Sequence, residues 1–125
     1  MPDVEGARRI YELMVLTAWA DGKVEPNEAL TVREIVAGFP DIGNKSELSR
    51  AVKKRIDEKG FEEALRETAA AVADRADREL AFRCCARVLN AGEMDTEDLE
   101  ALAALQELFA LSGEDVKRLM ANLEG

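Results

Sequence analysis

The chain has 125 residues, 47% of them apolar and 34% charged, which is the balance of a single folded domain with a hydrophobic core. The net charge of −9 argues against a nucleic-acid-binding protein, because contact with phosphates requires a basic surface. No apolar run reaches the roughly 18 residues of a membrane helix, and no signal-peptide pattern is visible at the N-terminus. We therefore expect a cytoplasmic protein without a membrane span.

The residues that usually carry catalysis are scarce. Histidine is absent, which removes the commonest general base and the commonest metal ligand. No serine lies in a nucleophile-elbow pattern, and no glycine-rich phosphate loop is present. Cys84 and Cys85 are adjacent within a helical stretch, so we expect buried, unreactive thiols and neither a disulfide nor a zinc site. The sequence does not favour an enzyme.

The first half of the chain predicts three helices. Apolar residues recur at helical spacing, and capping residues mark the boundaries. We expect helices over residues 3–20, 26–38 and 44–58. Asp21-Gly22 ends the first, because glycine tolerates the left-handed conformation that closes a helix.

The second half predicts four more helices, after a break at Gly60. They are expected over residues 61–72, 74–89, 96–109 and 112–123, with either Asp95 or Thr96 as the cap of the third of these. Seven helices joined by short connections predict one all-α bundle that spans residues 1–125.

The apolar positions of each helix are predicted to face a common core. The inward positions in the first three helices are Ala7, Ile10, Tyr11, Met14, Ala18, Ala29, Val32, Ile35, Val36, Phe39, Leu48, Val52 and Ile56. The inward positions in the last four helices are Phe61, Ala64, Leu65, Thr68, Val72, Ala81, Phe82, Cys85, Val88, Leu89, Leu99, Leu102, Ala103, Leu105, Phe109, Val116, Leu119, Met120 and Leu123.

An internal pseudo-repeat relates two helix–helix corners. The segment ADGKVEPNEAL at residues 20–30 aligns with NAGEMDTEDLE at residues 90–100, an offset of 70 residues that places Gly22 on Gly92. Both glycines are expected to serve the backbone conformation of the corner. The chain therefore contains two helix–turn–helix units with further helices between them, an arrangement that would bring the two corners together.

The first corner partly matches a calcium-binding EF-hand loop. With the corner glycine at position 6 of that loop, Asp21, Glu25 and Glu28 fall on ligand positions 5, 9 and 12. Positions 1 and 3 fall on Thr17 and Trp19, which lie in the first predicted helix. The second corner matches fewer positions, so a true EF-hand is disfavoured.

Two interpretations of the acidic corners remain open. Carboxylates at a helix N-terminus complement the helix dipole, and this structural role needs no ligand. Alternatively, corners that pack side by side would form one acidic pocket, which suits a hard divalent cation such as calcium, magnesium or manganese. The residues of that pocket would be Asp21, Glu25, Glu28, Asp95 and Asp98.

Charge is unevenly distributed along the chain. Residues 45–59 carry six bases against three acids, and residues 93–115 carry eight acids and no base. A solvated helix face explains each segment, and each also fits a surface that docks a protein partner. Charge reversal at Lys53, Lys54 and Arg55 would test the docking interpretation.

The stretches AWADGKVEPNEALTVREIV and AGEMDTEDLEALAALQELFALSGEDV resemble the TerB-like domain family, which includes the tellurite-resistance TerB proteins and the N-terminal region of membrane-anchored J-domain co-chaperones. The resemblance spans most of the chain and implies a bacterial, all-α, non-enzymatic domain, with metal binding proposed for its paired acidic motifs. It implies Asp21 and Glu28 as acids of the first motif. In the second motif it implies Asp95 and Asp98, while Ala91 stands where the family often has Asp.

These features predict a stand-alone TerB-like protein of the tellurite-resistance or stress-response type. It would bind a divalent cation at the acidic corners and catalyse no reaction. The alternative is a metal-free, adaptor-like module whose basic third helix or acidic sixth helix docks a partner. We expect either a protein partner or a homo-oligomer.

Overall fold

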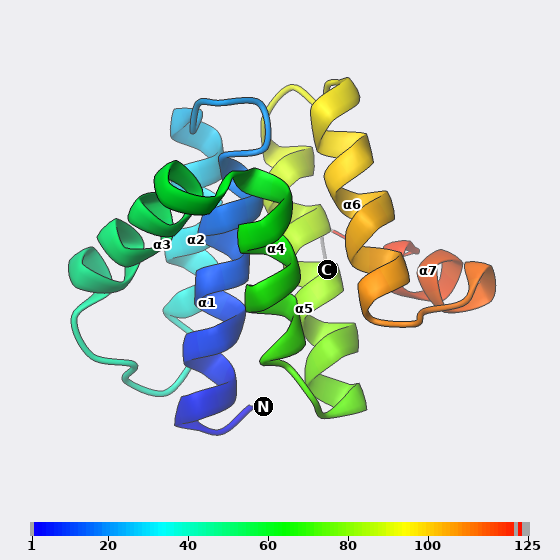
Figure 1. The fold of residues 1–125 in the computed structure, drawn as a ribbon. Coiled ribbons are helices and arrows are strands. Elements are labelled where there is room, and N and C mark those ends of the chain that lie inside the picture. The colour runs from blue at the N-terminus through cyan, green and yellow to red at the C-terminus, as the bar shows by residue number, and fades with distance from the viewer. Residues whose placement is uncertain (1, 122, 124–125) are drawn as a thin grey trace.

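The computed structural model describes residues 2–121 and 123, and in this part of the chain seven helices and no strands form an all-α bundle (Figure 1). The helices are α1 (Val4–Ala18), α2 (Pro26–Val36), α3 (Lys45–Lys59), α4 (Phe61–Ala70), α5 (Arg75–Ala91), α6 (Thr96–Leu108) and α7 (Gly113–Met120). The predicted fold class is confirmed. Within the described ranges, no helix has both the length and the apolar character needed to cross a bilayer.

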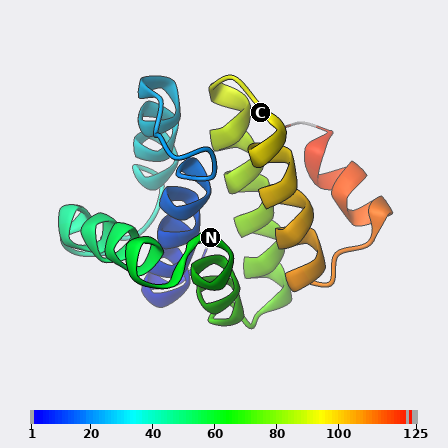
Figure 2. The same ribbon diagram turned by 45° about the horizontal axis from the view of Figure 1, so that its top comes forward.

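Helices α1 and α5 form the centre of the bundle. They pack against each other, and α1 also contacts α2, α3, α4 and α6. Helices α2 and α3 lie on one side of this centre, and α6 and α7 lie on the other side (Figure 2). The α1–α2 corner and the α5–α6 corner lie at the same end of the bundle (Figure 1). The predicted approach of the two corners is therefore confirmed.

Local capping residues explain where the helices begin. Asp3 accepts a hydrogen bond from the N–H of Gly6 at 2.8 Å, and Asn44 accepts one from the N–H of Glu47 at 3.1 Å. Asp95, and not Thr96, is the N-cap of α6. Such caps contribute about 1 kcal/mol each, because they satisfy N–H groups that have no partner inside the helix.

The core follows the predicted apolar pattern with three exceptions. Ala29, Leu99 and Ala103 were predicted to face inward and are exposed, Leu99 with 57% of its surface accessible. In α6 the reason is the helical phase. Asp98 is only 1% exposed, and because successive helical residues are rotated by about 100°, its burial directs Leu99 toward solvent.

Cys84 and Cys85 are unpaired thiols buried in α5. Burial raises the pKa of Cys84 to about 11 and that of Cys85 to about 12, so little thiolate is available to react. We expect both thiols to react very slowly with the thiol reagent DTNB at about pH 8 in the native protein, and rapidly after unfolding in guanidinium. Rapid labelling of the native protein would contradict this assignment.

Candidate metal centre

The two corners of the pseudo-repeat are in direct contact. The Oε2 atom of Glu25, which precedes α2, accepts a hydrogen bond from the N–H of Glu93 at 2.9 Å, across a sequence separation of 68 residues. This bond ties the first corner to the backbone of the second.

The two corner glycines have different roles. Gly22 has a φ of +87°, so the expectation that it serves the backbone conformation is confirmed. Gly92 has a φ of −98°, which any residue can adopt, so the same expectation is wrong for Gly92. A Cβ atom on Gly92 would overlap Oε2 of Glu25 and lie 3.0 Å from Cγ of Glu28. Gly92 is required because the two corners approach so closely.

Three aspartates from the two corners form a cluster. One carboxylate oxygen each from Asp21, Asp95 and Asp98 lies within 4.8 Å of the other two. Asp95 and Asp98 also cap α6 reciprocally: Oδ1 of Asp95 accepts from the N–H of Asp98 at 3.1 Å, and Oδ2 of Asp98 accepts from the N–H of Asp95 at 3.2 Å. The capping role inferred from the sequence is therefore present for this pair.

Capping does not use all of the Asp98 carboxylate. Its Oδ1 atom is buried and has no hydrogen-bond partner among the described residues. Burial raises the pKa of Asp98, and the nearby carboxylates of Asp95 and Asp21 raise it further. The hydrogen bond from the backbone N–H of Asp95 acts in the opposite direction and lowers this pKa. The Asp98 side chain thus holds a desolvated acceptor beside two other acids.

Glu28 and Glu25 lie beside this cluster. Glu28 is 2% exposed, and its Oε1 accepts from the N–H of Glu25 at 2.9 Å. Burial raises the pKa of Glu28 to about 7, with further contributions from the charges of Asp98, Glu25 and Asp21. Within residues 2–121 and 123, no Lys or Arg forms an ion pair with any of the five predicted site acids.

The EF-hand arrangement does not fit the first corner. Thr17, which would occupy the first ligand position, lies fully buried inside α1, and its hydroxyl donates to the carbonyl of Met14 at 3.1 Å. A cation at this end of the bundle would instead draw its ligands from both corners. The arrangement is a set of hard oxygen ligands, which suits divalent cations such as calcium, magnesium or manganese.

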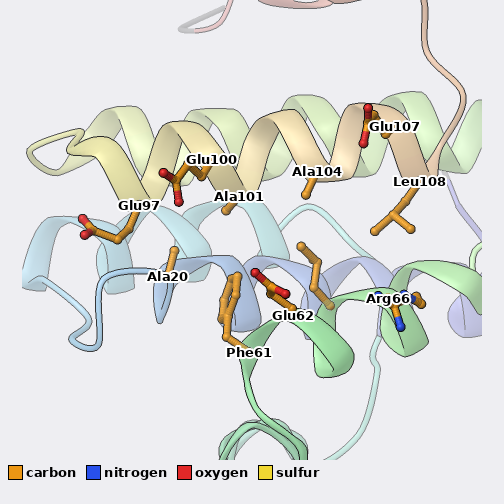
Figure 3. A pocket seen from close by; sticks show the side chains of 11 residues that line it. Ala20, Phe61, Glu62, Arg66, Glu97, Glu100, Ala101, Ala104, Glu107 and Leu108 are labelled. Carbon is orange, nitrogen blue, oxygen red and sulfur yellow. The ribbon is translucent and has the colours of Figure 1, made fainter.

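A separate cleft of about 370 Å³ lies between α4 and α6 (Figure 3). Its lining includes the acids Glu62, Glu97, Glu100 and Glu107, and one base, Arg66. None of the clustered aspartates lines this cleft. It is an acidic surface feature distinct from the corners.

Sequence reasoning missed the unpartnered oxygen of Asp98 and the steric role of Gly92. A signal for the first was present, because Asp98 falls on the same inward helical phase as Leu102, Leu105 and Phe109. The second has no local signal, because it depends on a glutamate from the other corner.

Comparison with protein-family models, curated proteins and solved structures gave no match. The TerB-like resemblance therefore stays a prediction from the sequence.

Proposed function

We propose that this protein binds a divalent cation between its two acidic corners and acts as a non-enzymatic, TerB-like protein of the tellurite-resistance or stress-response type. Asp21, Asp95 and Asp98 would supply the ligands, with Glu25 and Glu28 beside them. The observation that carries the proposal is the buried Oδ1 of Asp98, which has no hydrogen-bond partner in the described chain and belongs to a cluster of three aspartates.

The energetics of the cluster favour a counter-ion. A buried acceptor without a partner costs about 1–3 kcal/mol, and more when it is charged. Like-charged carboxylates in one site also repel each other, and this repulsion adds to burial, the larger cause, in raising the pKa values of Glu28 and Asp98. A cation would supply the missing partner and offset this repulsion.

The spacing of the aspartates is compatible with calcium. Calcium binds oxygen at about 2.3–2.6 Å, so two oxygens on the same ion are at most about 5 Å apart. The three aspartate oxygens lie within 4.8 Å of one another. Magnesium holds its ligands at about 2.0–2.1 Å, so two oxygens on one magnesium ion are at most about 4.2 Å apart.

Terbium luminescence tests the site directly, because the single tryptophan, Trp19, lies two residues before Asp21. Terbium, which stands in for calcium, is expected to give saturable sensitised emission that calcium displaces. Calcium at one hundred times its Kd should also stabilise the fold by about 2.7 kcal/mol, a rise in Tm of roughly 10 °C.

Isosteric variants separate binding from capping. Asp98→Asn and Asp21→Asn are expected to abolish both the emission and the calcium-dependent rise in Tm. The matched control is Asp74→Asn, because Asp74 also caps a helix, α5, but lies outside the cluster. If calcium and terbium leave wild-type Tm and emission unchanged, the corners are helix caps only, and the metal-free interaction module becomes the better account.

A further inference from the structure

A groove on the other side of the bundle has an apolar floor and a basic rim. It lies between α1, α2 and α3 and has a volume of about 670 Å³. The buried side chains of Val15, Val32 and Val36 form its floor. Arg33 and Lys45, together with Arg50, are exposed at its rim, and no Asp or Glu of the described part of the chain lines it. We call this surface the basic groove.

The basic residues of the groove differ from the neighbouring bases on α3. Lys53, Lys54 and Arg55, which the sequence suggested as a docking surface, form ion pairs with Asp57 at 2.7 Å, Glu58 at 3.8 Å and Glu12 at 3.6 Å, respectively. In contrast, Arg33, Lys45 and Arg50 form no ion pair with any residue in the described ranges. Of the bases on α2 and α3, those without an ion pair in the described ranges therefore all lie at the groove.

The exposed side of α6 that borders the α4–α6 cleft has the complementary character, and Glu100 and Glu107 belong both to this side and to the cleft lining. Leu99 is 57% exposed, and Glu100, Ala103 and Glu107 are exposed beside it. Neither glutamate forms an ion pair within residues 2–121 and 123, and Figure 3 shows both on α6. We call these four residues the α6 outer face.

We propose that the α6 outer face of one copy docks into the basic groove of a second copy. Along α1 the groove runs from Tyr11 to Trp19, and the outer face runs from Leu99 to Glu107. At 1.5 Å per residue, each is about 12 Å long. Leu99 and Ala103 would cover the valine floor while the two glutamates meet the basic rim, which is the helix-in-groove mode of recognition.

The position of the two surfaces determines the kind of assembly. Helices α2 and α3 lie on the side of the bundle opposite α6 (Figure 2). A contact between two different surfaces on opposite sides is head-to-tail, so each copy can engage two others and form a ring or an open chain. This inference does not depend on the proposed cation site.

The contact is expected to be weak. A face of one short helix buries less than the roughly 1,200 Å² of a stable interface, and each copy carries a net charge of −9. At 0.15 M ionic strength the Debye length is about 8 Å, so the repulsion between distant charges is screened while pairs in contact still interact. Association should therefore depend on concentration.

Sedimentation equilibrium at about 0.15 M salt tests the proposal. The weight-average mass is expected to rise above that of the 13.8 kDa monomer as the concentration increases into the high micromolar range. The groove variant Arg33→Glu/Arg50→Glu and the outer-face variant Glu100→Lys/Glu107→Lys should each raise the Kd of association at least about tenfold, because like charges then face each other.

Two controls make the result decisive. The variant Lys54→Glu/Lys117→Glu changes the net charge as the groove variant does but lies outside the groove, and it should associate like the wild type. A mixture of the groove and outer-face variants should regain association, because the reversed charges are again complementary. The proposal would be overturned if the wild type stayed monomeric at all concentrations. It would also be overturned if the control variant associated as weakly as the groove variant, or if the mixture of the two variants stayed monomeric.

Discussion

Replacing Gly92 with alanine is expected to lower the free energy of unfolding by about 2 kcal/mol and to abolish cation binding. The new Cβ would overlap Oε2 of Glu25. The Glu25 carboxylate would therefore have to move, and its hydrogen bond from the N–H of Glu93 would be lost. A hydrogen bond to a charged group contributes about 1.5–3 kcal/mol. Urea denaturation and terbium titration measure the two effects.

Gly38→Ala is the matched control for this prediction. At Gly38 the nearest atom to a new Cβ is the carbonyl oxygen of Ile35 at 3.5 Å, an ordinary contact, so the change in stability should stay below about 1 kcal/mol. A double-mutant cycle adds a sharper criterion, because Gly92→Ala should cost less once Glu25→Ala has removed the overlapping carboxylate. The contact of the new Cβ with Cγ of Glu28 at 3.0 Å would remain. Full stability and full terbium binding in Gly92→Ala would show that the close approach does not hold the corners together.

Without added cation, stability is expected to decrease as the pH rises from about 5 to about 8, by on the order of 2 kcal/mol. Glu28 has a pKa of about 7 in the folded protein, raised from 4.5. Between these two values the folded state binds more protons than the unfolded state, so the free energy of unfolding falls with increasing pH. The raised pKa of Asp98 acts in the same direction.

Glu28→Gln is expected to remove most of this pH dependence. The amide oxygen of glutamine can still accept from the N–H of Glu25, and a neutral side chain loses no stability when the pH rises. The measurement is urea denaturation in EDTA at about pH 5 and about pH 8. Glu62→Gln, at an exposed position in the first turn of α4, should behave like the wild type. An equal slope in Glu28→Gln and wild type would contradict the assignment to Glu28.

The parts of the fold that depend on residues close together in the sequence were predictable. The ranges predicted from the sequence begin at residues 3, 44 and 112, and the structure has helix caps at Asp3, Asn44 and Ser112. Such starts are readable because a cap uses the N–H of a residue three positions away. Inward and outward faces were less predictable. Apolar periodicity placed Leu99 in the core, whereas the burial of Asp98 sets the phase of α6 and leaves Leu99 exposed.

The candidate site was predictable only in part. The pseudo-repeat predicted that the corners meet, and the structure brings Asp21, Asp95 and Asp98 together. The sequence could not show that Glu25 would bond to the backbone of Glu93, or that Asp98 would keep an unpartnered oxygen. Both depend on the distance between segments that are far apart in the chain.

The contact between Glu25 and Glu93 makes the acidic cluster a property of the whole bundle. A contiguous metal-binding loop carries its ligands on one peptide and can retain them in a fragment. Here Asp21 comes from the first corner, and Asp95 and Asp98 come from the second, so neither half of the chain possesses the set. If the chain were cleaved and its halves separated, the ligands would be divided between the two fragments. The site would then be lost as soon as the α1–α2 pair separated from the α5–α6 pair.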